Sequence, residues 1–206
     1  MILFVPHELQ YDQTLFRAVL KNTFVYAQPP GIEFAKYDAV PGWVVQGDAV
    51  CSEKESERSR WIRLNPVKIP NIPADQMIQA RVSIFATGTL HVGEWPTAGL
   101  MVRSSGSFTA YLCVIDITHT RLQILSHEPD GPTGHYAIVA EATDSRISGA
   151  TQTLRFQVKG NALKCAIVGT NIKVSGTKTT QVGGTVGFFT YLTQACFDEL
   201  IVVNVP

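Results

Sequence analysis

Three glutamates at alternate positions, Glu53, Glu55 and Glu57, have the spacing that most directly suggests catalysis. On a β-strand they would share one face, and two carboxyl groups about 5–5.5 Å apart can supply the nucleophile and general acid of a retaining glycosidase. Cationic residues such as Lys54 and Arg58 interrupt the pattern, and no aromatic side chain that could stack on a sugar lies within it. We therefore interpret the segment as a solvated surface and expect a protein that is not an enzyme.

His135 and Tyr136 could together form the base and acid of a polysaccharide lyase, with Arg103, Arg155 or Gln157 neutralising a uronate. Neighbouring residues of a strand point to opposite faces, however, so this pair can line one groove only if the strand bulges. Polysaccharide hydrolase or lyase activity therefore remains a minor alternative.

The histidines are scattered along the chain, at His7, His91, His119, His127 and His135. None is separated from another by the i, i+2 or i+4 spacing that places two imidazoles on one metal ion. The sequence indicates no histidine-based metal site and no cofactor.

Candidate sugar-binding residues are aromatic or carry a fork of hydrogen-bond donors, because sugars bind to an aromatic plane and a few directional polar groups. Trp95 is the strongest candidate, since the Gly- and Pro-containing segment 91–97 is typical of a loop. For each candidate, packing into the core is the alternative explanation. The predicted carbohydrate-binding residues are Trp95, Arg103, Tyr111 and Tyr136.

The composition excludes several partner classes. Of the 206 residues 45% are hydrophobic, which is enough for a sizeable core. The 17 basic and 17 acidic residues cancel, and no run of Lys or Arg suggests binding to nucleic acid or anionic lipid. No apolar run approaches the roughly 20 residues of a membrane span. Without a signal-peptide pattern, we expect synthesis in a cytosol and no export by the general secretory route.

Four cysteines, Cys51, Cys113, Cys165 and Cys196, lie far apart in the sequence. Three of them fall in apolar, strand-like runs, so we interpret them as buried free thiols. Disulfides are the alternative, and the sequence does not choose among the three pairings that four cysteines allow.

Residues 1–31 differ from the rest of the chain and are predicted to form an N-terminal extension. The spacing of Leu15, Phe16, Val19 and Leu20 predicts a helix over residues 12–22, before the break at residues 29–31. This segment is either a helix packed on the domain or an arm that docks on another subunit or a larger assembly.

From residue 32 onward the apolar residues alternate with a period of two, which predicts a single β-domain over residues 32–206. Trp43 and Trp61 lie in strand patterns and are expected in the core. The clearest hairpin joins strands 153–159 and 162–168 through Gly160-Asn161, with Leu154, Phe156 and Val158 facing inward. About a dozen strands require two packed sheets.

The order of the motifs resembles the concanavalin A-like lectin/glucanase superfamily, with laminin G-like and carbohydrate-binding jelly-roll modules as the nearest likeness. The motifs are Ala-Gly-Leu-x-Val-Arg (98–103), a Tyr-led strand (111–116), Leu-Arg-Phe-x-Val-x-Gly-Asn-x-Leu (154–163), Gly-x-Val-Gly-Phe (184–188) and Phe-Asp-Glu-Leu-x-Val (197–202). The resemblance implies an all-β, two-sheet antiparallel β-sandwich of jelly-roll type, preceded by the short N-terminal arm. It also implies that Asp198 could help to hold a structural calcium ion with backbone oxygens near the start of the domain.

The sequence thus leads to a non-enzymatic module that recognises a glycan or a host-surface polysaccharide. The alternative is a structural, decoration or tail subunit of a phage or viral particle, docked or oligomerised through residues 1–31. A lectin-like domain without a signal peptide would then reach the outside as part of a virion.

Overall fold

The computed structural model describes residues 25–27, 42–46, 49–52, 60–63, 74–87, 96–105, 109–128, 136–147, 151–178 and 183–205. All regular secondary structure in these ranges is β, and none of it is a helix that could cross a membrane. The predicted helix over residues 12–22 and the acidic segment around Glu55 lie outside the described residues. The predicted all-β fold is confirmed.

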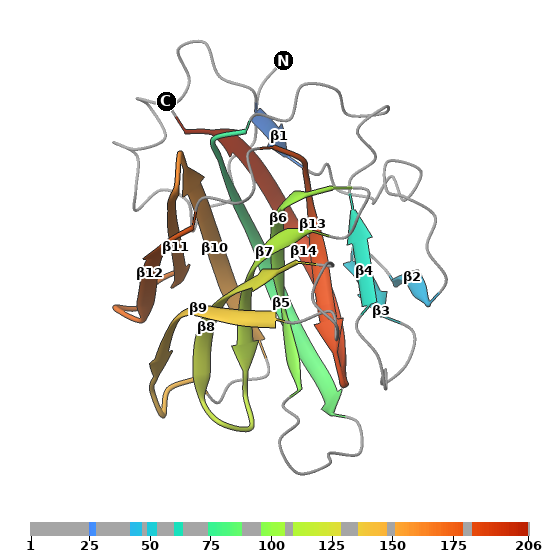
Figure 1. Cartoon of the computed structure of the whole chain (residues 1–206). Helices are drawn as coiled ribbons and strands as arrows, with labels where there is room; N and C mark the ends of the chain where they lie inside the picture. Colours follow the sequence, from blue (N-terminus) through green and yellow to red (C-terminus); the bar gives the residue numbers. More distant parts are fainter. Residues whose placement is uncertain are drawn as a thin grey trace.

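The larger of the two sheets contains eight antiparallel strands (Figure 1). Seven follow the order β12-β11-β10-β5-β14-β3-β2, and β1 pairs with β14 beside this path. The strands are β1 (Val25–Ala27), β2 (Trp43–Gln46), β3 (Ala49–Ser52), β5 (Gln76–Thr87), β10 (Thr151–Lys159), β11 (Ala162–Ile167), β12 (Lys173–Thr177) and β14 (Thr193–Asn204).

The smaller sheet contains six antiparallel strands in the order β4-β13-β6-β7-β8-β9. Strands β6, β7 and β8 form a meander, because strands that follow one another in the chain are also neighbours in the sheet. The strands are β4 (Arg60–Arg63), β6 (Thr97–Ser104), β7 (Ala110–Asp116), β8 (Arg121–His127), β9 (Tyr136–Thr143) and β13 (Thr185–Tyr191).

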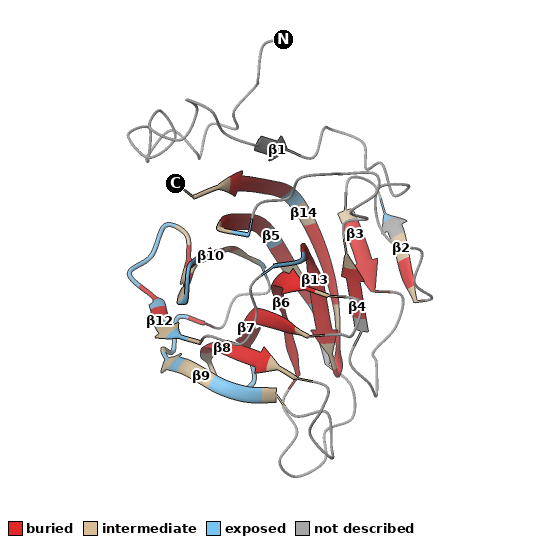
Figure 2. Ribbon diagram, turned by 45° about the horizontal axis from the view of Figure 1, so that its top comes forward, coloured by how far each residue is buried: buried red, intermediate tan, exposed pale blue. Residues whose placement is uncertain are grey.

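The main core lies between the two sheets and is built from alternate residues of nearly every long strand (Figure 2). Phe188 of β13 stacks on Phe197 of β14, with ring centroids 4.4 Å apart, so the closing strands of the chain contribute one aromatic from each sheet. Trp43 is buried in the same core, as predicted. Burying such aromatic area is the main force that holds two sheets together.

The predicted hairpin is confirmed as β10 and β11. Leu154, Phe156 and Val158 are fully buried, and Gly160 at the turn has a positive φ of 54°. A glycine tolerates this conformation without the steric cost that a side chain would add. The residues between the buried positions of β10 point away from the core, so one face of this hairpin meets solvent.

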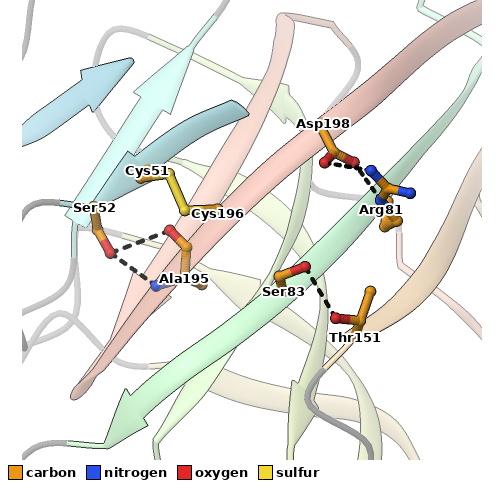
Figure 3. The surroundings of a disulfide bond; sticks show 8 residues. All are labelled: Cys51, Ser52, Arg81, Ser83, Thr151, Ala195, Cys196 and Asp198. Carbon is orange, nitrogen blue, oxygen red and sulfur yellow. Dashed lines mark hydrogen bonds and ion pairs between the residues drawn. A yellow bond between two sulfur atoms is a disulfide. The ribbon is translucent and has the colours of Figure 1, made fainter. Parts of the chain in front are cut away.

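The cysteines are paired, so the interpretation as free thiols is wrong. Cys113 of β7 is bonded to Cys165 of β11, which links one sheet to the other through the core. Cys51 of β3 is bonded to Cys196 directly opposite on β14 (Figure 3). The sequence did not reveal the pairing because the apolar strand patterns around Cys113, Cys165 and Cys196 suit a free thiol as well as a disulfide.

Beside the second disulfide, a side chain continues the hydrogen bonding between β3 and β14. The Ser52 hydroxyl accepts a bond from the Ala195 amide at 3.0 Å and lies 3.4 Å from the Ala195 carbonyl oxygen (Figure 3). A buried backbone amide without a partner would be costly. The Ser52 hydroxyl therefore provides a hydrogen-bond partner for the Ala195 amide of β14, at the point where backbone pairing with β3 ends.

Candidate concave binding site

The six-stranded sheet is strongly curved, and its outer face is concave. Trp61 lies on β4 and His127 on β8, with three strands between them, yet their ring centroids are 4.9 Å apart. In a flat sheet, four strand-to-strand steps would separate them by about 19 Å. The sheet must therefore curl so that its two margins approach each other across the outer face.

Four rings bridge this concave face, and we call them the aromatic cluster: Trp61, His127, Tyr136 and Phe189. Tyr136 lies 6.4 Å from Trp61, 4.6 Å from His127 and 5.5 Å from Phe189, measured between ring centroids. Trp61 is 8% exposed, whereas Tyr136 is half-buried. The cluster thus presents an aromatic edge to the surface above an apolar interior.

A continuous cross-strand row runs over the whole concave face. It passes from Trp61 and Phe189 through Gly99 and Val114 to Gln123 and Glu141. Glycine is required in the middle, because a Cβ at position 99 would collide with the Cys113 carbonyl oxygen of the adjacent strand. One row therefore connects aromatic side chains at one margin with polar side chains at the other.

The polar margin is built around a buried carboxylate at the end of β7. Asp116 is fully buried, and its Oδ2 atom accepts hydrogen bonds from Arg121 Nη2 at 2.7 Å and Arg121 Nε at 3.3 Å. His119 contributes its backbone amide, 3.0 Å from Oδ1, and its ring Nδ1, 2.8 Å from Oδ2. The Asp116 carboxylate therefore holds the side chains of His119 and Arg121 in fixed positions.

Gln123 fixes the second carboxylate of this margin. Its Nε2 atom donates to Glu141 Oε2 at 2.7 Å, while Arg121 Nη1 lies 3.7 Å from the same oxygen. Gln123 is fully buried, and its Oε1 atom has no hydrogen-bond partner. The Glu141 side chain is 40% exposed and that of Arg121 is 18% exposed. Buried groups thus orient a guanidinium and a carboxylate that both reach the surface.

We call these five residues the rim cluster: Asp116, His119, Arg121, Gln123 and Glu141. The surface pair offers donors on Arg121 beside acceptors on Glu141. A pair of neighbouring sugar hydroxyls can accept from one and donate to the other, and an oriented pair loses little side-chain entropy on binding. This arrangement suits directional recognition of hydroxyl groups.

Comparisons with solved structures identify the architecture. A carbohydrate-binding module, CBM66 of Bacillus subtilis, matches with a TM-score of 0.64 and 16% identity, over 80% of this chain and 93% of that one. The exoplasmic/lumenal domain of VIP36, bound to Ca²⁺ and Man3GlcNAc, matches with a TM-score of 0.57 and 10% identity, over 87% of each chain. A structure described as a native glycosidic hydrolase matches with a TM-score of 0.57 and 10% identity, over 91% of this chain and 99% of that one.

This chain has the concanavalin A-like, lectin-type β-sandwich fold. No protein-family profile matches the sequence, and no curated protein does. At such low identity the likeness establishes the lectin-type fold alone. A carbohydrate-binding module, a glycan-bound domain and a glycosidic hydrolase are among the proteins that share it.

Within the lectin-type sandwich, the predicted sugar-binding residues lie in different places. Tyr136 belongs to the aromatic cluster on the concave face. Trp95 lies outside the described residues. Both Tyr136 and Trp95 stay predicted sugar-binding residues.

Tyr111 must be corrected, because it is fully buried in the core between the sheets. The run from Tyr111 to Ile115 is apolar at every position, and β7 is buried on both faces. A strand buried on both faces shows no alternation that would reveal which way a given side chain points. Tyr111 supports the fold and is not available to a surface ligand.

Arg103 must also be corrected. Its side chain is 3% exposed, donates from Nε to the Ala74 carbonyl oxygen at 3.1 Å and lies 3.1 Å from Asp75 Oδ1. Asp75 also accepts the Gly160 amide at 2.8 Å. Arg103 thus ties the end of β6 to the start of β5 and to the β10–β11 turn, which is a structural role inside the protein.

Asp198, which stays a predicted calcium ligand, is paired with a cation among the described residues. Both of its oxygens accept hydrogen bonds from Arg81, each at 2.8 Å, on the outer face of the larger sheet (Figure 3). Calcium requires six or more oxygen ligands, and residues 32–41, at the start of the domain that was predicted to supply backbone oxygens, lie outside the described residues. The guanidinium already neutralises this carboxylate.

The rim cluster was not predicted from the sequence. The sequence feature that could have indicated it is the set of polar residues at the end of an otherwise apolar hairpin, namely Asp116, Arg121 and Gln123. Glu141, however, comes beside them only through the pairing of β8 with β9. Strand pairing, which no local pattern encodes, assembles the site.

Proposed function

We propose that this chain is a non-enzymatic glycan-recognition module that binds through the concave face of its six-stranded sheet. The observation that carries the proposal is the surface pair Arg121 and Glu141, oriented by buried Asp116 and Gln123. The presence of carbohydrate-binding modules and lectins among proteins with the same fold supports this assignment.

In this proposal Arg121 and Glu141 contact sugar hydroxyls, while Asp116 and Gln123 are positioning residues. Tyr136 supplies aromatic surface for the apolar face of a sugar ring, and Trp95 stays the predicted aromatic contact of segment 91–97. The ligand could be a free glycan or a polysaccharide on a host surface.

The test is a glycan array followed by calorimetry with the glycans that bind. The variants Glu141→Gln and Arg121→Lys retain much of the side-chain shape but alter the charge or the fork of donors. A hydrogen bond to a charged group is worth about 1.5–3 kcal/mol, so we expect each variant to bind about ten- to a hundredfold more weakly. Glu199→Gln, an exposed change on the other sheet, is the matched control.

Two results would overturn the assignment. One is the absence of glycan binding at millimolar ligand by the folded full-length chain. The other is binding that Glu141→Gln, Arg121→Lys and Trp95→Ala all leave unchanged. Turnover of neutral or acidic polysaccharides by the same preparation would replace the binding module with a hydrolase or lyase.

A role as a decoration or tail subunit of a phage or viral particle is compatible with glycan binding and stays a separate proposal. It assigns docking, or self-association, to residues 1–31. Residues 25–27 form β1, which pairs with β14 from Val25 opposite Val203. Deletion of residues 1–24 therefore leaves β1 in place, and it should abolish incorporation into particles without unfolding the sandwich; a truncated chain that still assembles would exclude this role.

A further inference from the structure

The outer face of β10, β11 and β12 carries a local excess of positive charge. From Ser145 to Phe197 the sequence contains no Asp or Glu, although the whole chain is neutral. The cations of the three strands are Arg155, Lys159, Lys164 and Lys173. Although the whole chain has no net charge, the outer face of β10, β11 and β12 is therefore positively charged.

Strand pairing gathers these cations on one side. Arg155 is opposite Ala166, which in turn is opposite Lys173, while Lys164 lies between Gln157 and Ser175. With strands about 4.8 Å apart and alternate residues about 6.6 Å apart, neighbouring cations are about 8–10 Å from one another. Lys159, Lys164 and Lys173 are exposed and Arg155 is half-buried. We call these four residues the basic face.

The described carboxylates around the basic face are already engaged with other cations. Asp198 is held by Arg81, on the next strand of the sheet. At the ends of the strands, Asp75 pairs with Arg103, and Glu128 lies 3.3 Å from Lys178. Among the described residues, the carboxylates at these margins are therefore engaged elsewhere and do not pair with Lys164 or Lys173.

We propose that the basic face binds an acidic polysaccharide. Its cations are spaced across a surface that also offers neutral hydrogen-bonding groups, among them Gln157, Ser175 and Thr153. A polysaccharide that carries sulfate or uronate groups repeats its charges along a chain and has hydroxyls between them, so both kinds of group on the face find partners. This site lies on the opposite sheet from the concave site and does not depend on it.

Other polyanions fit less well. Single-stranded nucleic acid is usually held by aromatic side chains on which bases stack, and the one aromatic residue of these three strands, Phe156, is fully buried. Stable attachment to an anionic membrane is helped by inserted apolar groups. The outward-facing positions of β11 and β12 are filled by Ala, Ser, Thr and Lys. These observations favour a hydrated polysaccharide.

The experiment measures binding of the full chain to immobilised heparin, which is sulfated, and polygalacturonate, which is carboxylated. We expect binding at about 0.05 M salt that is lost towards 1 M, because exposed charges are screened at high ionic strength. The double variant Lys164→Gln/Lys173→Gln should bind about tenfold or more weakly, and Lys164→Arg/Lys173→Arg should retain binding. Gln46→Glu/Ser145→Asp changes the net charge by the same amount at exposed sites elsewhere and should bind normally.

Three outcomes would overturn the proposal: no binding to either polysaccharide at low salt, an equal loss in the Gln46→Glu/Ser145→Asp control, or lysine-dependent binding to phosphatidylserine vesicles or single-stranded DNA alone. Binding to only one of the two polysaccharides supports the proposal and identifies the anionic group. Glu141→Gln should leave polyanion binding intact. The proposal for the basic face can therefore be disproved independently of the proposal for the concave face.

Discussion

Cys113 and Cys165 are joined across the core, one from each sheet, and this bond encloses a stretch with a sequence separation of 52 residues. A disulfide restricts the unfolded chain more strongly than the folded one. It therefore opposes separation of the sheets in addition to the stabilisation from burial. Two such bonds in one chain also suit an oxidising environment better than a reducing one, in contrast to the expectation of free thiols.

Removal of the inter-sheet disulfide should lower stability. We expect Cys113→Ala/Cys165→Ala to reduce the free energy of unfolding by about 2–5 kcal/mol, measured by urea denaturation. The unreduced protein, unfolded in the presence of a thiol reagent, should show no free thiols. Four reactive thiols in protein purified without reductant would contradict the pairing.

The two candidate tyrosines should respond differently to truncation. Tyr111→Ala removes a fully buried core side chain and should cost about 3–5 kcal/mol of unfolding free energy. Tyr136→Ala affects a half-buried ring on the concave face and should cost less than half as much. Equal losses in denaturant melts would mean that Tyr136 is a core residue rather than part of a binding surface.

Two glycines provide a test of the close approach between β6 and β7. Gly99→Ala places a Cβ against the Cys113 carbonyl oxygen and should prevent normal folding or reduce the yield of soluble protein severely. Gly160→Ala meets no neighbouring atom within 4 Å and costs only the strain of a positive φ, about 1 kcal/mol. Comparable stability of the two variants would exclude the predicted collision.

A salt bridge at one end of the sandwich should make stability depend on pH in acid. Hydrogen bonds from the side chain and backbone of Arg146 lower the pKa of Asp144 from 3.8 to about 2. The ion pair therefore stabilises the fold above pH 3.8, and its contribution is lost as the pH falls towards about 2. Asp144→Asn should lower the melting temperature slightly at neutral pH but not near pH 2.

Because Asp144 and Arg146 are exposed, salt should shrink the difference at neutral pH. The Asn171 side chain also accepts from Arg146 Nη2 at 2.7 Å. The control is therefore made in the Arg146→Ala background. There, adding Asp144→Asn should not lower the melting temperature further. A pH-independent effect of Asp144→Asn would point to loss of packing instead.

Calcium should not stabilise the protein through Asp198. We expect Asp198→Asn to lower the unfolding free energy by less than about 1 kcal/mol, as is usual for an exposed ion pair. Neither added Ca²⁺ nor EDTA should shift the melting temperature by way of this residue. A calcium-dependent rise in melting temperature that Asp198→Asn removes would restore Asp198 as a ligand.

The β-fold could be predicted from the sequence because the alternation of apolar and polar residues in a strand is visible within a short segment. Thr153 to Val168 shows a strict period of two around Gly160-Asn161, and the structure follows it as β10 and β11. Tyr111 was misassigned because β7 is apolar on both faces. The cysteines fit the strand pattern equally well as free thiols or as disulfides.

Both proposed binding surfaces depend on residues brought together by non-local pairing. Arg121 and Glu141 meet through β8 and β9, and Lys164 and Lys173 meet through β11 and β12. Each of these side chains is an ordinary outward-facing polar residue in its own strand. No single-strand pattern distinguishes such residues from solvated surface.

The two sheets turn their outer faces in opposite directions, with the core between them. A ligand on the concave face therefore cannot obstruct a ligand on the basic face, and both can be occupied in one molecule. A single chain could then cross-link a hydroxyl-rich glycan to a polyanionic matrix. In such a network the retention of the protein would depend on avidity rather than on the affinity of either face.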